Sequence, residues 1–340
     1  MRTLKVLVAV VLVLALAAGV LYWLRRKHSQ TPLPTATPSA PFVTQGRLQI
    51  YALDVGQGDS LLIISPTGKT VLIDGGNVQA GEAVIAALQR HGVKTIDLAV
   101  ASHPHADHIG GLRRVLERVP VKNLLDSGQS FASTEYERLL RVTRDKRIKL
   151  INAKRGLNFD LEAGVRLDAF HPQGDGKWLT DVRSGGSVEN ANSVVLRLSY
   201  GAFSMLFTGD AEAETEAALL KARFPLQAQV LKVGHHGSRY ATSGRFLETV
   251  APQTAVISCG NDNRYAHPAQ ATLDRLRKAR IAVFRTDLSG ELAIISDGKQ
   301  FDVFPTRATD LAALWLGRMG VDEMALVLPK GARKTEQERD

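Results

Sequence analysis

The chain has 340 residues, 44% of them hydrophobic, which suits one large globular domain or two small ones. Its single cysteine, Cys259, excludes an internal disulfide framework and any metal site built from several thiolates. The formal net charge of +9 favours polyanionic partners, either nucleic acid or an anionic membrane surface.

The N-terminus is expected to anchor the chain to a membrane. Within residues 1–28, a short basic start precedes an uninterrupted apolar run from Val6 to Leu24, just long enough to span a bilayer. A signal peptide cleaved near Ala17 is the alternative, but the run continues beyond a usual signal sequence. Residues 29–46 are rich in Pro, Thr and Ser and predict a semi-extended linker. We therefore expect an extracytoplasmic globular domain, membrane-anchored or secreted after cleavage.

The globular part is predicted to span residues 47–306 and to open with strands at 47–55, 61–64 and 70–73. The glycines of the turn Gly56-Gln57-Gly58-Asp59-Ser60 allow a close approach to another strand or to a ligand. Asp74 follows the third strand, where its carboxylate could orient a metal-binding histidine or form only an Asx turn.

The next strand, 96–101, runs into a group of side chains that can bind metals. His103 and His105 alternate on an extended chain, so both imidazoles can point to one side. Asp107 and His108 then lie at the start of a predicted helix. Imidazole and carboxylate suit zinc or manganese, and two neighbouring ions can share such ligands.

The middle of the chain is less specific. A helix is expected at 133–145, and the run from Arg138 to Arg155 carries eight basic residues. This run is either a solvated surface or a surface that grips phosphates. A strand is expected at 159–171, and the polar loop 173–186 could form a rim or lid.

Further strand ends carry more candidate ligands. Asp210 follows a predicted hairpin (194–200 and 203–207) and could bridge two metals or cap a helix. The strand 230–233 runs into His235 and His236. After a strand at 254–258, further elements are expected: a helix at 269–279, closing strands at 282–285 and 291–295 with a turn at 287–290, a helical extension at 307–328 and a disordered tail at 329–340.

These residues resemble the metallo-β-lactamase superfamily. More narrowly, residues 53–60, 207–210, 232–238 and 263–268 resemble the hydrolase domain of ComEC-type DNA-uptake proteins, in the same order along the chain. The resemblance covers roughly residues 47–300 and implies an α/β fold, the αββα sandwich, in which helices cover two β-sheets.

The resemblance also implies a ligand set for two divalent ions, zinc or manganese. Site one would take His103 and His105, and site two Asp107 and His108, with Asp210 bridging. Either His235, the first choice, or His236 would complete site two, and Asp74 would steady the histidine loop. The superfamily often supplies a third site-one histidine, but this chain has Glu189-Asn190-Ala191-Asn192-Ser193 there. This departure suggests a weakly held first ion, such as manganese.

The activity implied is hydrolysis of a phosphodiester, with DNA at the cell surface as substrate and the DNA-uptake machinery as a partner. Asp107 or Asp210 could accept a proton, and His267 could protonate the leaving oxygen or be merely structural before Pro268. Candidate substrate contacts are Gln57, Asp59, Ser238, Arg239 and Arg264. One alternative is a hydrolase of the same fold acting on a phosphocholine ester, a lactone or a β-lactam. Another is a non-catalytic DNA-binding or assembly protein. The apolar run from Val6 to Leu24 is a single span, which by itself cannot form a DNA pore.

Overall fold

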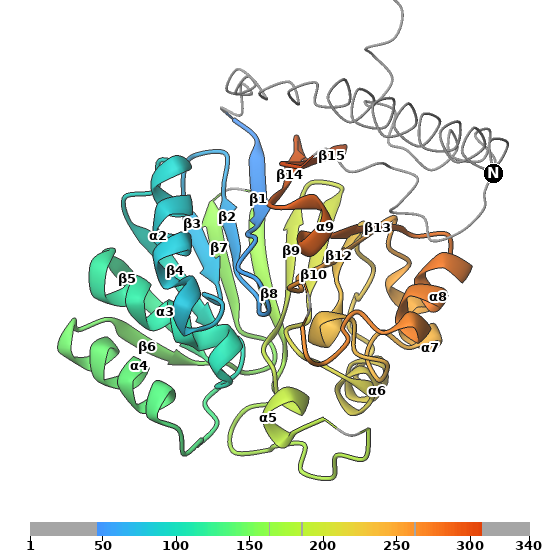
Figure 1. Cartoon of the computed structure of the whole chain (residues 1–340), viewed down its shortest axis with the longest axis horizontal. Coiled ribbons are helices and arrows are strands. Elements are labelled where there is room, and N and C mark those ends of the chain that lie inside the picture. The colour runs from blue at the N-terminus through green and yellow to red at the C-terminus, as the bar shows by residue number, and fades with distance from the viewer. Residues whose placement is uncertain (1–45, 163, 185, 262, 308–340) are drawn as a thin grey trace, which may run out of the picture. The chain divides into compact units, whose positions relative to one another are not determined.

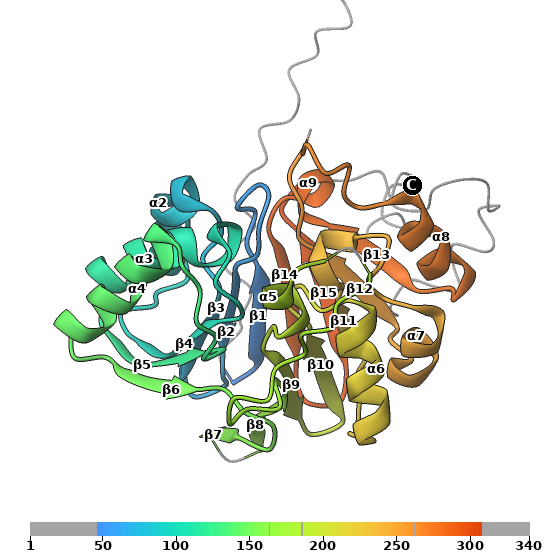
Figure 2. The same cartoon turned by 90° about the horizontal axis from the view of Figure 1, so that it is seen from below.

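Two β-sheets lie face to face, with helices on their outer faces, in a computed structural model that describes residues 46–307 apart from 163, 185 and 262 (Figures 1 and 2). The sandwich predicted from the sequence is therefore confirmed. The predicted membrane segment, nearly all of the linker, and the C-terminal extension and tail lie outside the described residues. Within the part that is described, no helix is long and apolar enough to cross a membrane.

The first sheet has eight strands in the order β15-β14-β1-β2-β3-β4-β5-β6, and the second has seven in the order β13-β12-β11-β10-β9-β8-β7, counted over the described residues. The strands of the first sheet are β1 Leu48–Ala52, β2 Leu61–Ile64, β3 Thr70–Ile73, β4 Ile96–Ala101, β5 Val121–Asp126, β6 Lys149–Asn152, β14 Leu292–Ser296 and β15 Phe301–Pro305. Those of the second are β7 Asn158–Glu162, β8 Val165–His171, β9 Val195–Tyr200, β10 Phe203–Phe207, β11 Val230–Lys232, β12 Thr254–Ile257 and β13 Ala282–Arg285.

The helices cover the outer faces and connect the strands. Those against the first sheet are η1 Val78–Ala80, α2 Gly81–Arg90, α3 Ala106–Arg118 and α4 Thr134–Asp145. The remaining ones are α5 Val188–Ala191, α6 Ala213–Ala222, η2 Gly234–Gly237, α7 Gly244–Val250, α8 Gln270–Lys278 and α9 Thr286–Ser289.

Alternation along the strands builds three apolar layers. Leu48 and Ile50 of β1 point into the core between the sheets, whereas Tyr51 points to the outer layer beneath α2, α3 and α4. On the other side, Leu219, Phe246 and similar residues of α6 to α8 pack on the outer face of the second sheet. Burial on both faces explains why these strands read as nearly continuous apolar runs.

The sheet topology decides where the polar loops meet. Strands β3 to β6 are parallel in the first sheet and β10 to β13 are parallel in the second. Carboxyl ends of parallel strands lie at one edge, where ligands of open α/β sheets usually bind. Asp74 and Ser102 follow β3 and β4, and Asp210 follows β10. These loops converge at one edge of the sandwich.

Backbone packing holds the histidine loop close to its neighbours. A Cβ atom at Gly111 would lie 2.0 Å from the carbonyl oxygen of Gly75, so α3 rests directly on the chain that leaves β3. The amide of Gly75 also donates to the carbonyl of His108 at 2.7 Å. The glycines therefore bring the start of α3 against the Asp74 loop.

Most predicted strands are present, with five differences. The strand expected at 159–171 is two strands, β7 and β8, paired as a hairpin. The basic run contains β6, the edge strand of the first sheet. The turn expected at 287–290 is largely the short helix α9, and neither β15 nor α7 was predicted.

Candidate metal centre

The first half of the centre comes from the loop between β4 and α3. His108 is fully buried, and its Nδ1 donates to Oδ2 of Asp74 at 2.9 Å. Asp74 also accepts from the amide and hydroxyl of Ser102, at 2.8 and 2.7 Å. This fixed carboxylate leaves Nε2 of His108 free to face the centre, the usual arrangement behind a metal-binding histidine.

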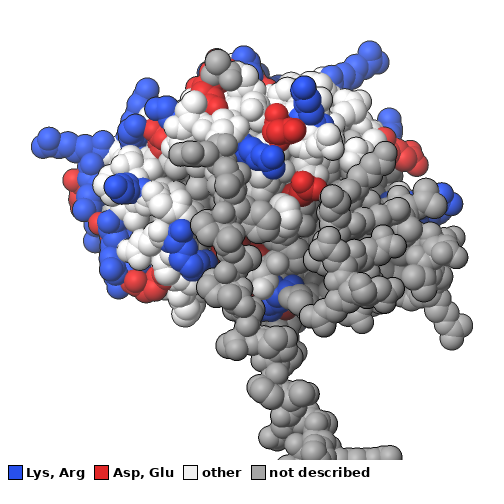
Figure 3. Space-filling view, turned by 90° about the horizontal axis from the view of Figure 1, so that it is seen from above, with Lys and Arg blue, Asp and Glu red and all other residues white. Residues whose placement is uncertain are grey.

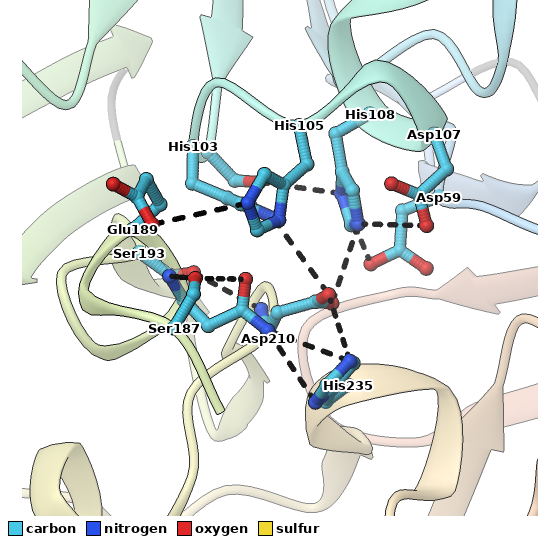
Figure 4. A network of polar contacts seen from close by, with 12 residues as sticks. Asp59, His103, His105, Asp107, His108, Ser187, Glu189, Ser193, Asp210 and His235 are labelled. Atoms are coloured by element: carbon cyan, nitrogen blue, oxygen red, sulfur yellow. Dashed lines mark hydrogen bonds and ion pairs between the residues drawn. The ribbon is translucent and has the colours of Figure 1, made fainter. Parts of the chain in front are cut away.

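Asp210 occupies the middle of the centre, between imidazoles on both sides (Figure 4). Its Oδ1 lies 3.3 Å from His108 Nε2 and 3.7 Å from His236 Nε2. Its Oδ2 lies 3.7 Å from both His103 Nε2 and His235 Nε2. The carboxylate is only 2% exposed, and its two oxygens serve two different groups of side chains. A bridging ligand between two ions needs this placement.

His235 and His236 diverge because both have left-handed backbone, with φ of 44° and 51°. His236 points inward: its Nδ1 donates to the Ser258 carbonyl at 2.9 Å, and its Nε2 lies 3.3 Å from Asp107 Oδ2. His235 is instead held by Glu212, at 2.7 Å from its Nδ1. Of the two candidates for site two, His236 therefore faces Asp107, whereas His235, the first choice, lies between Asp210 and Glu212.

The unpaired atoms of the centre fit a divalent cation. His108 Nε2, His236 Nε2 and Asp210 Oδ1 are buried without a hydrogen-bond partner, which is rare for polar atoms. Two donors on one tetrahedral zinc ion lie about 3.4 Å apart, close to the separations found here. Among the described residues, four groups of side chains have donor atoms within 4.8 Å of one another: His103, His108 and Asp210; Asp107, His108 and His236; Asp59, Asp74 and His108; and Asp59, Asp210 and His236. His105 Nδ1 lies 3.1 Å from His103 Nε2, on the side of site one.

The charges also favour a cation. Burial alone would raise the pKa of Asp210, but the imidazoles of His108, His236 and His235 outweigh it and hold the pKa well below its usual range. Burial lowers the pKa of His103 well below its usual value, so this imidazole is neutral, the form that binds metals. Burial would lower the pKa of His108 and His236, but Asp210 and the neighbouring carboxylates raise it, to about 10 for His236, so these two imidazoles would release a proton on binding a metal.

Comparison with known proteins identifies the family. The model of the metallo-beta-lactamase superfamily matches residues 53–261, more than half of the chain. The chain belongs to the metallo-β-lactamase superfamily. This fold typically carries metal-dependent hydrolases and binds divalent metals, and the clusters above could hold them.

Relatives within the superfamily include competence proteins. The chain is 31% identical over 261 residues to ComE operon protein 3 of Bacillus subtilis (strain 168), covering 72% of this chain and 32% of that protein. It is 32% identical over 252 residues to Competence protein ComA of Neisseria gonorrhoeae, covering 74% and 32%. The chain thus spans about a third of the length of these relatives. The metallo-beta-lactamase fold protein YhfI of Bacillus subtilis is a similar solved structure, with a TM-score of 0.47 and 14% identity, covering 74% of this chain and all of that one.

Two predicted substrate contacts need correction. Asp59 is 1% exposed, and its Oδ2 lies 2.6 Å from Nζ of Lys232, so it binds a buried cation beneath the centre. Ser238 is also buried, and its hydroxyl donates to Glu212 at 2.6 Å. At 1% and 3% exposure, neither side chain is open to solvent. Two features of the sequence could have revealed these partners: Lys232 lies inside an apolar strand, and Glu212 comes two residues after Asp210.

The other predicted residues lie around the rim. Arg239 and Arg264 are exposed, and the ring of His267 lies 5.3 Å from that of His235. Gln57 accepts a hydrogen bond from the amide of Gly260 at 3.2 Å, which joins the glycine turn to the loop after β12. Asn190, in the segment 189–193, has its Nδ2 3.4 Å from Nδ1 of His235.

Proposed function

We propose that this chain is a metal-dependent phosphodiesterase that hydrolyses DNA. The observation that carries the proposal is the buried carboxylate of Asp210, which presents one oxygen to His103 and the other to His108 and His236. A pair of zinc or manganese ions held by these residues would lower the pKa of a bound water and neutralise phosphate oxygens.

The chain's own residues divide the remaining work. The Asp107 side chain is 32% exposed, against 2% for Asp210, which makes Asp107 the carboxylate better placed to accept a proton from an attacking water. His267 is half-buried beside His235 and faces the same rim, where it can donate to a leaving oxygen. His235 is held in place by Glu212 at 2.7 Å.

The exposed positive charge of the domain suits an anionic ester as substrate better than a lactone or a β-lactam. Arg264 is exposed, and the negative charge of Asp107 contributes to the raised pKa of its guanidinium, after the contact with Tyr265. Arg239 is exposed in the loop that follows His236. Lys and Arg also gather on the side of the domain that carries α2 to α4 (Figures 1 and 3). These cations suit phosphate groups on both sides of a scissile bond.

The relatives point to the same class of substrate, since one is named for competence. By extension, we propose that residues 1–28 tether the chain to the membrane, with the hydrolase domain outside the cytoplasm and DNA-uptake machinery as its partner. The apolar run from Val6 to Leu24 supports the tether.

Purified full-length chain, loaded with Zn²⁺ or Mn²⁺, should cleave defined single- and double-stranded DNA. A chelator or the variant Asp210→Asn should abolish cleavage, and Asp160→Asn, a change at an exposed carboxylate, should not. Hydrolysis of nitrocefin, a lactone or p-nitrophenyl phosphorylcholine without DNA cleavage would assign the centre to another class of substrate. DNA binding by metal-loaded protein without cleavage of any ester would support the non-catalytic alternative.

A further inference from the structure

An exposed tyrosine lies at the end of a row of rings that leads to the metal centre. Tyr265, in the loop between β12 and α8, is 51% exposed. Among the described residues, Tyr265 and Tyr240 are the aromatic side chains exposed to this degree. Leaving so much of an aromatic ring in water forgoes the stabilisation that burial would give.

The segment 263–267, which carries Tyr265, is closed by hydrogen bonds of the Asn263 side chain. The side-chain amide of Asn263 donates to the carbonyls of Gly260 and His267 at 2.9 and 2.6 Å. Its oxygen accepts from the amide of His267 at 2.9 Å. Tyr265 is therefore presented on a fixed support, as a pre-organised binding group requires.

A row of rings connects Tyr265 to the centre. Its ring lies 5.9 Å from that of His267, with an angle of 25° between the two planes. The ring of His267 lies 5.3 Å from His235, and that of His235 lies 6.0 Å from His236. The exposed tyrosine thus ends a continuous row of rings that begins at a candidate metal ligand.

Arg264 adds a charged plane to the exposed end of this row. Its Cζ lies 4.9 Å from the centre of the Tyr265 ring, and its Nη2 donates to the tyrosine hydroxyl at 2.7 Å. Guanidinium and aromatic planes are the groups on which proteins stack unpaired bases. The same guanidinium can contact the phosphate that joins such a base to its neighbour.

We infer that Arg264 and Tyr265 form a stacking platform for an unpaired nucleobase, so that the ligand of this rim is single-stranded nucleic acid. The inference rests on the proposed function, because it assigns a strand type to the same substrate. A base within a duplex has both faces covered by its neighbours, whereas an unpaired base can lie on an exposed ring. A single strand would then reach the centre with one base held on the rim.

The test is binding without turnover. Full-length chain in detergent and EDTA is titrated into fluorescein-labelled single strands of DNA, of RNA and of abasic DNA of equal length, followed by fluorescence anisotropy. Tyr265→Ala should weaken binding of the base-containing strand about 10- to 100-fold. Tyr265→Phe, which keeps the ring, should stay within a few-fold of the wild type. Tyr240→Ala, a matched change at a similarly exposed tyrosine, should also bind normally. The strand that binds more tightly, DNA or RNA, identifies the type of nucleic acid that supplies the base.

The abasic strand distinguishes a loss of base stacking from a general loss of nucleic-acid binding. Wild-type protein should bind it more weakly than ordinary DNA, and Tyr265→Ala should cause little further loss. Equal losses on ordinary and abasic strands, or an equal loss in Tyr240→Ala, would overturn the platform. Failure of wild-type, metal-loaded protein to cleave any phosphodiester would instead count against the proposed hydrolase, because base-dependent binding in EDTA requires no catalysis.

Discussion

Lys232 and Asp59 form a buried ion pair directly behind the metal centre, with 2.6 Å between Nζ and Oδ2 and both side chains 1% exposed. Lys232 ends β11 of the second sheet, whereas Asp59 lies in the turn after β1 of the first. Burial alone would raise the pKa of Asp59, but Lys232 and His236 lower it to about 2. Oδ1 of Asp59 also lies 3.4 Å from Nδ1 of His236. The pair therefore joins the two halves that supply the ligands.

Removing one partner of this pair should destabilise the fold strongly. Lys232→Met leaves the Asp59 carboxylate buried without its cation, at a cost of about 3–5 kcal/mol in the free energy of unfolding. Urea denaturation followed by circular dichroism measures this change. Lys122→Met is the matched control, because Lys122 pairs with Asp97 at the same 2.6 Å but is 57% exposed. That variant should lose no more than about 1 kcal/mol. Similar losses in both variants would argue against a special role for the buried pair.

Asp74 should control metal affinity rather than the fold alone. Asp74→Asn preserves the shape of the side chain but removes the charge that polarises His108 through its Nδ1. Loss of such a supporting carboxylate typically weakens metal binding 10- to 100-fold. Competition with a chromophoric zinc chelator measures the dissociation constant, with Asp160→Asn as a control that should bind normally. An unchanged affinity in Asp74→Asn would show that the charge of Asp74 does not support a metal ligand.

The two neighbouring histidines should differ in their effect on metal content. His236→Ala removes a buried Nε2 that faces Asp107 and Asp210, so about one equivalent of metal should be lost. His235→Ala should keep the site-two ion, because Glu212 holds that ring away from Asp107. Elemental analysis of dialysed protein gives both stoichiometries. The reverse order would restore His235 as the site-two ligand.

His171 should make the metal-free fold sensitive to mild acid. Burial lowers its pKa from 6.5 to about 4, and its Nε2 donates to the carbonyl of Ala191 at 3.0 Å. The unfolded chain therefore binds a proton at this residue before the folded chain does as the pH falls. The stability that depends on neutral His171 is complete above pH 6.5 and is lost toward pH 4, by roughly 3 kcal/mol.

Urea denaturation of EDTA-treated protein at several pH values between 8 and 4 measures this effect. His171→Asn cannot bind that proton, so it should be less stable at pH 8 but lose less stability on acidification than the wild type. Parallel pH profiles for the two proteins would show that another group is responsible.

Much of the architecture could be predicted because its signals are local. Apolar runs such as 61–64, 70–73 and 96–101 are strands in the structure because they are largely buried on both faces, which favours apolar side chains. The histidine motif follows one of these runs directly, so His103 had to lie at a strand end and His108 at the start of the helix that follows. Because the motif and the strand are adjacent in the sequence, such placements can be predicted without knowledge of long-range contacts.

The tertiary structure decided what depends on contacts between distant segments. The different positions of His235 and His236 come from the left-handed backbone of both residues and from the contact of His235 with Glu212. Neither feature can be seen in the pattern of apolar and polar residues. Asp59 looked like a residue that meets substrate, but packing of the two sheets places it against Lys232, far along the chain. By itself the sequence determined which residue types stand at the strand ends. Only the packed sheets decided which of them face the centre, because burial and charge pairing arise when both halves come together.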